Sequence, residues 1–290
     1  MNTRILTRDD WWAWLRASPP LRNERGAWTK VSETAWVLET DSQGTQMDSR
    51  LVLSNAVDPA DSVVVVPYYS VGRVLSADES RSEGEALGGP LLDRGFHVLA
   101  VPWWAEVEAS ALGSRAIDLQ ERYGPPAERG RQQASSLGLG RAVVDIMRVI
   151  NSLDALLPGK RVHIMGHSLG AKLALWTAAL DLRISSLVMH EPGLGWQFSN
   201  WDAPWYLDGR IPDVDLDSLL ALVAPRPALY VGGGGFDGDA NAELARSAVR
   251  MSGYSDWLST LHHNAGHRMP PHVVAACVEW LADREREVSR

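Results

Sequence analysis

Residues 161–180 read RVHIMGHSLGAKLALWTAAL, and this stretch decides the fold. Residues 161–165 are apolar enough for a buried strand, and residues 169–180 are rich in alanine and leucine, which favour a helix. Between them lies Gly166-His167-Ser168-Leu169-Gly170, a G-x-S-x-G pattern whose sharp strand-to-helix turn would expose the hydroxyl of Ser168. The two glycines let the backbone approach closely. We therefore predict a nucleophilic Ser168; the alternative is a glycine-rich turn capped by a serine.

The sequence after residue 62 alternates between two patterns. Short, continuously apolar runs are separated by helical segments, which is typical of a parallel sheet covered by helices on both faces. The predicted strands are 63–66, 97–101, 161–165, 185–190, 228–231 and 257–262. The predicted helices are 80–94, 140–157, 169–180, 216–223, 240–251 and 271–287. This doubly wound α/β architecture binds ligands beyond the carboxyl ends of its strands.

The N-terminal part of the chain has a different pattern. TAWVLET (34–40) and SRLVLS (49–54) alternate apolar and polar residues and predict an antiparallel hairpin at the sheet edge. Before them, residues 9–17 predict a short helix. No linker or internal repeat divides the chain, so we predict a single domain over residues 1–290, with residues 1–27 as a helical arm.

Composition narrows the class of partner. The chain has 290 residues and a formal net charge of -8, which disfavours nucleic acid and membranes and favours a small molecule as partner. No run approaches the roughly 18 uncharged apolar residues of a membrane span. The single cysteine, Cys277, permits no internal disulfide, and the N-terminal residues lack a secretory apolar run. We therefore expect a cytoplasmic protein, while no pattern indicates its oligomeric state.

Several motifs resemble those of the α/β-hydrolase superfamily, from about Trp28 to the C-terminus. These motifs are GHSLGAKLALW (166–176), EPGLGWQFSNWDAPWYL (191–207), APRP (224–227) and GHRMPP (266–271). More narrowly, the chain resembles the serine esterases grouped with dienelactone hydrolases and acetyl-xylan esterases. This resemblance implies an α/β-hydrolase fold and hydrolysis of carboxylic esters. True dienelactone hydrolases carry cysteine as the nucleophile, where this chain has Ser168, so their specific activity is not implied.

A nucleophilic serine needs a general base, and the superfamily order of serine, acid and histidine places that base after the last strand. His267 lies there, in the loop 264–271, and we predict it as the base. The alternative is a histidine of an exposed loop without a chemical role. His262 and His263 fit better at the end of the preceding strand.

Two carboxylates compete for the role of orienting His267. Asp237 follows the strand 228–231 and is flanked by glycines, so its loop could swing the short side chain toward the base. Glu191 ends the preceding strand and is followed by a proline, which stiffens the chain. We favour Asp237 and keep Glu191 as the alternative acid or as a wall of the pocket.

Glucuronoyl esterases offer a second comparison for the same positions. The chain resembles them in carrying an acid at Glu191 and a lysine four residues after the serine, at Lys172. It departs from them at Leu169, where they carry arginine directly after the serine. The departure weakens the expectation of glucuronoyl esterase activity.

An oxyanion formed by attack of Ser168 needs backbone N–H donors. Leu169, at the start of the helix, is predicted to supply one of them. The second should come from the loop after the strand 63–66. Pro67 has no N–H, so Tyr68 or Tyr69 must provide it.

The long connection of residues 191–215 is rich in aromatic residues, and connections of that length are usually functional. We predict a short lid-like insertion over Ser168; the alternative is ordinary packing of a long loop. The side chains predicted to contact the substrate are Trp103, Trp104, His167, Lys172, Trp196, Trp201 and Trp205.

Two further patterns are set aside. The run Gly233-x-Gly235-x-x-Gly238 matches a dinucleotide-binding pattern, but only one strand follows it, too few for that fold. The histidines at 262, 263 and 267 are separated by Asn264 and Gly266, which break any helix that would align them for zinc. We therefore predict neither a metal nor a cofactor.

These observations favour a cofactor-free serine hydrolase that cleaves a carboxylic ester of a small organic molecule through an acyl-enzyme. The same residues would also serve lactone or thioester hydrolysis, acyl transfer or a cyclisation in a biosynthetic pathway. A third alternative is a binding protein that uses the pocket without chemistry. The identity of the substrate is not readable from the sequence.

Overall fold

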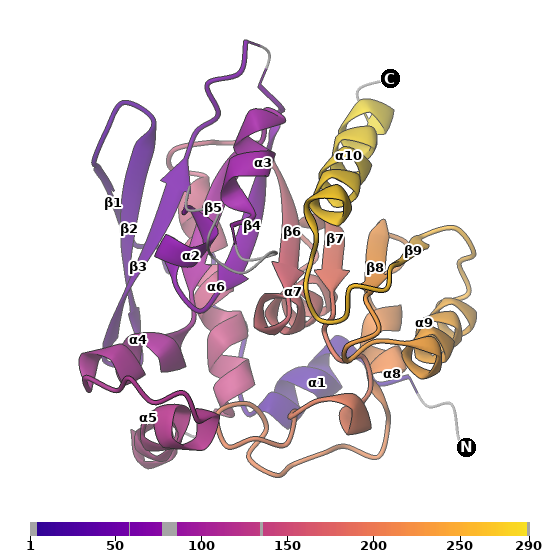
Figure 1. Ribbon diagram of the computed structural model, residues 1–290. Helices are drawn as coiled ribbons and strands as arrows, with labels where there is room; N and C mark the ends of the chain where they lie inside the picture. Colours follow the sequence, from indigo (N-terminus) through magenta and orange to yellow (C-terminus); the bar gives the residue numbers. More distant parts are fainter. Residues whose placement is uncertain (1–4, 58, 77–85, 134–135, 289–290) are drawn as a thin grey trace.

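One sheet forms the centre of the computed structural model, which describes residues 5–57, 59–76, 86–133 and 136–288 (Figure 1). Within these residues nine strands follow the order β1-β2-β3-β5-β4-β6-β7-β8-β9 across the sheet. Strands β4 to β9 run parallel to one another, whereas β1, β2 and β3 form an antiparallel edge. The strands are β1 Ala27–Lys30, β2 Ala35–Ser42, β3 Thr45–Val52, β4 Ser62–Tyr68, β5 His97–Pro102, β6 Arg161–His167, β7 Ile184–His190, β8 Ala228–Gly232 and β9 Leu258–His262.

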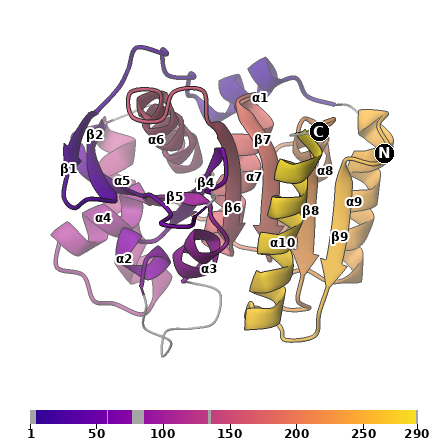
Figure 2. The ribbon, with the colours of Figure 1, turned by 90° about the horizontal axis from the view of Figure 1, so that it is seen from above.

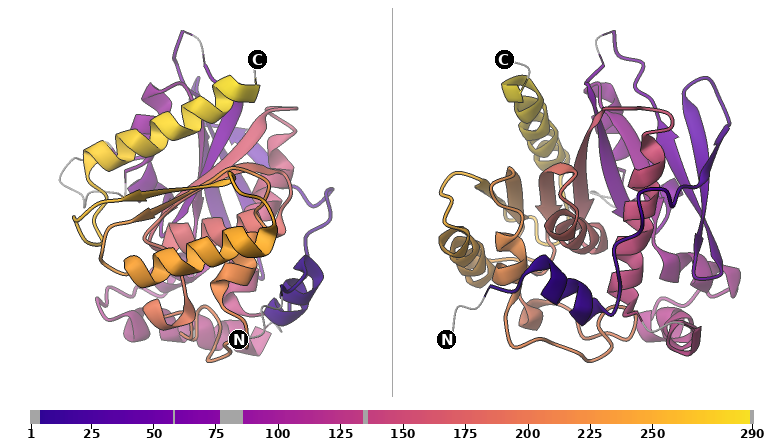
Figure 3. Two further views of the ribbon diagram at one scale, coloured as in Figure 1. Left: turned by 90° about the vertical axis from the view of Figure 1, so that its right-hand side faces the viewer. Right: turned by 180° about the vertical axis from the view of Figure 1, so that it is seen from behind.

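Helices cover both faces of the sheet (Figure 2). Helices α1, α6, α7, α8 and α9 pack on one face, and α2, α3 and α10 pack on the other. Viewed toward the β9 edge, α9 and α10 lie on opposite sides of the sheet (Figure 3). The helices are α1 Arg8–Leu15, α2 Val71–Val74, α3 Gly88–Asp93, α4 Trp104–Ala111, α5 Leu119–Gln133, α6 Gly138–Leu153, α7 Leu169–Leu180, α8 Leu216–Ala221, α9 Asp239–Ser252 and α10 Pro271–Val288.

Strand β4 explains why the central strands are apolar without alternation. Val63 and Val65 belong to the core beneath α6 and α7, whereas Val64 and Val66 belong to the core beneath α10. Successive side chains of a strand point to opposite faces, so a sheet covered on both sides needs an apolar residue at every position. The predicted parallel sheet with an antiparallel edge is confirmed.

Helix α7 lies in the middle of the molecule, and all of its residues are buried. It can lie this close to the sheet because its second residue is glycine. A β-carbon at Gly170 would lie only 2.3 Å from the carbonyl oxygen of Pro67 in β4. On the outer side, Trp11 of α1 packs its ring against Trp176, with ring centroids 5.2 Å apart and an interplanar angle of 85°.

The predicted strands and most predicted helices match the observed ones within a few residues, but the strand β1 and three helices, α2, α4 and α5, were missed. Helices α4 and α5 follow β5, where the sequence analysis assigned no structure. Helix α5 is strongly polar and holds Pro125 and Pro126, which normally argue against a helix. The predicted helix 80–94 is observed as α3, Gly88–Asp93; its part over residues 80–85 lies outside the described residues.

None of the helices in the described ranges combines the length and the apolar content that crossing a bilayer requires. The cytoplasmic location expected from the sequence stays a prediction.

Close packing at Gly170 yields a test of the fold. We expect Gly170→Ala to lower the free energy of unfolding by about 1–3 kcal/mol, because the new methyl group would overlap a backbone atom that cannot move aside. Gly130→Ala is the matched control, since no atom lies within 4 Å of its β-carbon position and alanine favours the helix α5. Urea unfolding followed by tryptophan fluorescence measures both. Equal midpoints for the two variants would contradict this account of α7.

Candidate active site

Ser168 occupies a sharp turn between β6 and α7. Its backbone angles, φ 54° and ψ -117°, lie outside the regions that most residues prefer. The turn requires glycine at position 166, because a β-carbon there would lie 2.1 Å from the carbonyl carbon of Gly170. The backbone N–H of Ser168 donates to the carbonyl oxygen of His190 at 2.9 Å, which ties the turn to the end of β7. The predicted strand-turn-helix context of Ser168 is confirmed.

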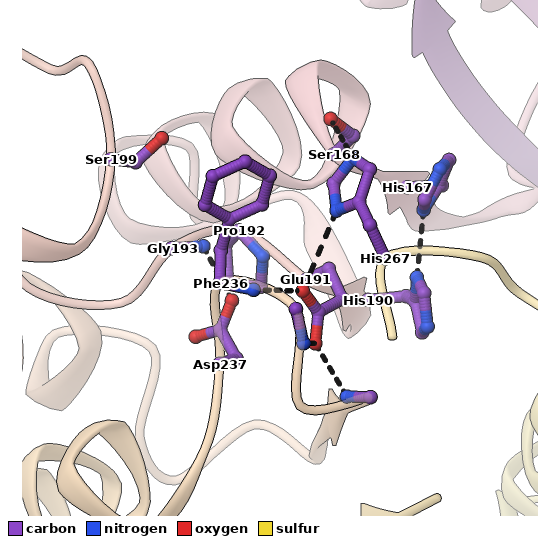
Figure 4. A network of polar contacts seen from close by, with 12 residues as sticks. His167, Ser168, His190, Glu191, Pro192, Gly193, Ser199, Phe236, Asp237 and His267 are labelled. Carbon is purple, nitrogen blue, oxygen red and sulfur yellow. Dashed lines mark hydrogen bonds and ion pairs between the residues drawn. The ribbon is translucent and has the colours of Figure 1, made fainter. Parts of the chain in front are cut away.

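His267 lies next to the serine hydroxyl. Its Nε2 atom is 2.9 Å from Oγ of Ser168, a hydrogen-bonding distance (Figure 4). The histidine sits in the loop between β9 and α10, and its side chain is 37% exposed. The ring of Phe236 stands perpendicular to the imidazole at a centroid distance of 4.8 Å. The structure thus brings together the predicted nucleophile and the predicted base.

The carboxylate that faces His267 is that of Glu191. Its Oε2 atom lies 3.4 Å from Nδ1 of His267, on the side of the ring opposite Ser168 (Figure 4). Glu191 directly follows β7, and its side chain is fully buried. Backbone N–H groups of Gly233, Gly235 and Phe236 donate to the carboxylate at 2.5, 3.3 and 2.6 Å.

This environment keeps Glu191 ionised. Burial alone would raise the pKa of its carboxyl group, but the hydrogen bonds from His267 and from the backbone N–H groups outweigh burial, so the pKa lies below its ordinary value. A negatively charged Glu191 can accept the Nδ1–H of His267. It can also stabilise the imidazolium that forms when the ring takes up a second proton.

Asp237, the acid favoured from the sequence as the partner of His267, forms its hydrogen bonds elsewhere in the structure, which corrects that prediction. The carboxylate of Asp237 accepts hydrogen bonds from the N–H groups of Gly193 and Leu194 at 2.6 and 2.8 Å. It also accepts one from the hydroxyl of Tyr230 at 2.8 Å. Asp237 therefore connects the loops after β7 and β8, and burial raises its pKa despite these bonds.

The glycines around Asp237 have a different role from the one expected. The sequence predicts that they free the Asp237 loop to move, whereas in the structure they let this loop close over Glu191. A β-carbon at Gly235 would lie 2.8 Å from Oε2 of Glu191 and 2.6 Å from the backbone nitrogen of His267. At Gly233 it would lie 2.0 Å from the carbonyl oxygen of Gly266. The glycine run thus packs the acid and the base together.

The predicted oxyanion donors lie beside the serine. Leu169 is the first residue of α7, where backbone N–H groups have no partner within the helix. Tyr68 ends β4, and Tyr69 follows it. Tyr69 lines both cavities at Ser168, whereas Tyr68 lines only the larger one. Which tyrosine donates stays a prediction.

Two cavities meet at Ser168 and share Tyr69, Leu119, Tyr123, Ser168 and His267. The larger has a volume of about 520 Å³, and its other lining residues are Tyr68, Arg73, Arg115, Ala116, Ile117, Arg122, His167 and Arg268. The smaller has a volume of about 420 Å³ and is otherwise lined by Leu169, Lys172, Glu191, Ser199, Asn200, Trp205, Tyr206 and Phe236. The contribution of residues 115–123 to the cavity walls was not predicted from the sequence. The only sequence signal for it is that this stretch follows a strand end and has no assigned structure.

Lys172 is buried in the wall of the smaller cavity. Its ammonium group donates to the carbonyl oxygen of Pro192 at 2.8 Å and to the hydroxyl of Ser199 at 2.7 Å. The same group lies 3.9 Å from the ring centroid of Trp201. Burial lowers the pKa of Lys172 to about 7. The predicted positions of Lys172, His167 and Trp205 at the pocket agree with the cavity walls.

The four other predicted tryptophans do not line either cavity at Ser168. Trp103 and Trp201 are buried among other aromatic rings. Trp104 and Trp196 donate from their indole N–H groups to the carbonyl oxygens of Gly138 and Val214. These side chains therefore anchor residues 191–215 and the start of α4, as the packing alternative proposed.

Within the described part of the chain, no three His, Cys, Asp or Glu side chains are arranged to hold a metal ion.

Comparisons with known proteins show which sequences and structures this chain resembles. No curated protein matches the chain by sequence. Among solved structures, a carbohydrate esterase family 15 glucuronoyl esterase from Caldicellulosiruptor kristjansonii has a TM-score of 0.68 and 13% identity, over 98% of this chain and 88% of that one. A glucuronoyl esterase of the same family from Teredinibacter turnerae has a TM-score of 0.63 and 16% identity, over 99% and 87%. A Bacteroides fragilis protein provisionally described as an acetyl xylan esterase has a TM-score of 0.64 and 18% identity, over 88% and 73%.

These structural likenesses lie at low identity and concern the fold. A family model adds a match by sequence: the model described as the alpha/beta hydrolase fold matches residues 90–263, more than half of the chain. That match includes the nucleophile turn, the Glu191 strand end and the glycine run, and the sheet order and the geometry at Ser168 agree with it. The protein therefore belongs to the alpha/beta hydrolase fold family.

Proposed function

We propose that this protein is a serine esterase that hydrolyses a carboxylic ester of a small organic substrate. The observation that carries the proposal is the continuous contact from Oγ of Ser168 through His267 to the buried carboxylate of Glu191. Nucleophile, base and orienting acid in this geometry are what acyl transfer requires. The esterase names of the three structural neighbours support the same reaction class.

The proposed reaction begins when Nε2 of His267 takes the proton of Ser168 as Oγ attacks the ester carbonyl. Glu191 accepts a hydrogen bond from Nδ1 and stabilises the charged ring. This 3.4 Å contact is long for a hydrogen bond, and such distances commonly shorten when substrate binds. The N–H of Leu169 and a second N–H from Tyr68 or Tyr69 are the proposed donors to the oxyanion.

The second half of the reaction releases the products. His267 returns its proton to the leaving alcohol, and the acyl group remains on Ser168. Water then enters and attacks the acyl carbonyl as it loses a proton to His267. His267 returns that proton to Oγ of Ser168 when the bond between Oγ and the acyl carbon breaks and the acid leaves. The two cavities on either side of Ser168 provide separate space for the acyl and alcohol parts of a compact ester.

The nucleophile is tested first. We expect Ser168→Ala to abolish covalent labelling by a fluorophosphonate and to lower turnover of an activated ester by roughly 10⁴- to 10⁶-fold. Alanine removes only the attacking oxygen, so the circular dichroism spectrum and the unfolding midpoint should stay close to those of the wild type. Turnover near the wild-type level in this variant would refute the proposal.

The two carboxylates are tested by a matched pair of amide substitutions. We expect Glu191→Gln to lower kcat by roughly 10³- to 10⁴-fold, because a neutral amide cannot stabilise the imidazolium of His267. Asp237→Asn should instead act mainly on stability, because its amide nitrogen, a donor, would face the N–H group of either Gly193 or Leu194. Steady-state kinetics and urea unfolding of both variants separate the two effects. A greater kcat loss in Asp237→Asn than in Glu191→Gln would restore the assignment favoured from the sequence.

A further inference from the structure

The larger cavity beside Ser168 carries a charge opposite to that of the whole chain. Four arginines line it, Arg73, Arg115, Arg122 and Arg268, and its described lining includes no aspartate or glutamate. The chain as a whole has 36 acidic and 28 basic residues. Because the charged groups in its described lining are all cationic, in a protein of net charge -8, the cavity concentrates positive potential next to the nucleophile.

Two of these arginines already have partners. Arg122 donates to the carboxylate of Glu106 from two nitrogens, at 2.5 and 2.9 Å, and Tyr123 donates to the same carboxylate. This ion pair holds the start of α5 against α4. The guanidinium of Arg73 lies 5.2 Å from the ring centroid of Tyr69.

The other two arginines remain available. Arg115 and Arg268 are exposed, and neither forms a hydrogen bond or an ion pair with any residue in the described ranges. Arg115 comes from the segment before α5, and Arg268 follows the proposed base His267 directly. They therefore bring to the cavity, from different parts of the chain, two guanidinium groups without an acidic partner among the described residues. Guanidinium groups bind carboxylates with two parallel hydrogen bonds.

The inner wall of the cavity adds a hydrogen-bond donor, whose identity follows from three imidazole rings in contact: His263, His190 and His167. The backbone N–H of Ala265 donates to Nδ1 of His263, so the proton of that ring sits on Nε2. Nε2 of His263 is 2.9 Å from Nε2 of His190, which must accept. His190 then carries its proton on Nδ1, 2.7 Å from Nδ1 of His167.

The last of these three rings is His167, which lines the larger cavity. Since its Nδ1 accepts from His190, its remaining nitrogen, Nε2, carries the proton and is a donor. Burial lowers the pKa of His167 to about 3 and that of His190 to about 2, so both rings stay neutral and this order of donors and acceptors holds at neutral pH. The side chains at this wall and rim therefore offer donors to an anionic acceptor.

We propose that the larger cavity binds a carboxylate group of the ester substrate, held at the rim by Arg115 and Arg268. The inference rests on the proposed esterase function and narrows it: the preferred substrate is an ester that carries a second, free acid group a few bonds from the ester carbonyl. Its acyl or its alcohol part can carry that group. The cavity sets the distance between the ester carbonyl and the free acid group, because its walls include both Ser168 and the two arginines.

Two matched substrate pairs test the proposal. In the first, 4-nitrophenyl hydrogen adipate is compared with its neutral methyl ester, which places the anion on the acyl side. In the second, 4-acetoxybenzoate is compared with methyl 4-acetoxybenzoate, which places it on the alcohol side. We expect the wild type to favour the anionic member of at least one pair by about tenfold in kcat/KM, and added salt to reduce this preference.

The double variant Arg115→Gln/Arg268→Gln should lose that preference, mainly through a higher KM for the anionic ester. Arg129→Gln is the matched control. Arg129 is an exposed arginine of α5 that lines neither cavity at Ser168, so its loss should leave the anionic-to-neutral ratio unchanged. A wild type that favours the neutral member of both pairs, or a double variant that keeps the wild-type ratio, would overturn the proposal.

A binding measurement separates failure of this inference from failure of the esterase function. The reaction products adipate and 4-hydroxybenzoate are titrated calorimetrically into the Ser168→Ala variant with and without the two arginine substitutions. If binding weakens about tenfold with the substitutions and the wild type hydrolyses neither substrate pair, the anion site stands and the esterase function is refuted. Hydrolysis of both pairs with no effect of charge keeps the esterase and refutes the anion site. If the wild type hydrolyses neither substrate pair and the Ser168→Ala variant binds neither product, both proposals are refuted.

Discussion

The close contact between the backbone of β6, the start of α7 and the carbonyl of Pro67 is the constraint on which the site depends. Gly166 and Gly170 meet at distances that leave no room for a β-carbon, and Ser168 between them adopts strained backbone angles. The cost of this turn is offset by the burial of the whole of α7 against the sheet. Because α7 cannot shift, the hydroxyl of Ser168 has a fixed place above the strand ends.

The neighbouring strand ends supply two buried carboxylates with different roles: one faces the base, and the other fixes the loop that carries the first. Glu191, after β7, is held ionised by three backbone N–H groups and faces His267. Asp237, one loop further, binds N–H groups of the chain after Glu191 and so fixes the segment that carries it. The acid that contacts the base and the acid that braces its loop are thus distinct residues.

Features that depend on local sequence patterns were predicted correctly, whereas features that depend on tertiary contacts were not. The strands, the turn at Ser168 and the position of His267 follow from local patterns and chain order, and the structure agrees with them. The choice between Glu191 and Asp237 depends on which way a loop closes, and glycines permit both directions. Arg122 of the larger cavity was missed because the helix that carries it, α5, contains Pro125 and Pro126 and has few apolar residues. The tryptophans were overrated because aromatic side chains also anchor long loops.

The complete burial of α7, set against the exposure of the segment before α5, bears on how such a protein can diversify. A substitution in α7 would have to be accommodated by the sheet, by α6 and by the nucleophile at once. The sequence of this helix therefore tolerates little change. Arg115 and Ile117 are exposed residues of the surface segment between α4 and α5. Selection can therefore alter what enters the cavity by replacing residues there, while the reacting groups keep their arrangement. Descendants of one such fold could exchange substrates without losing the ability to fold.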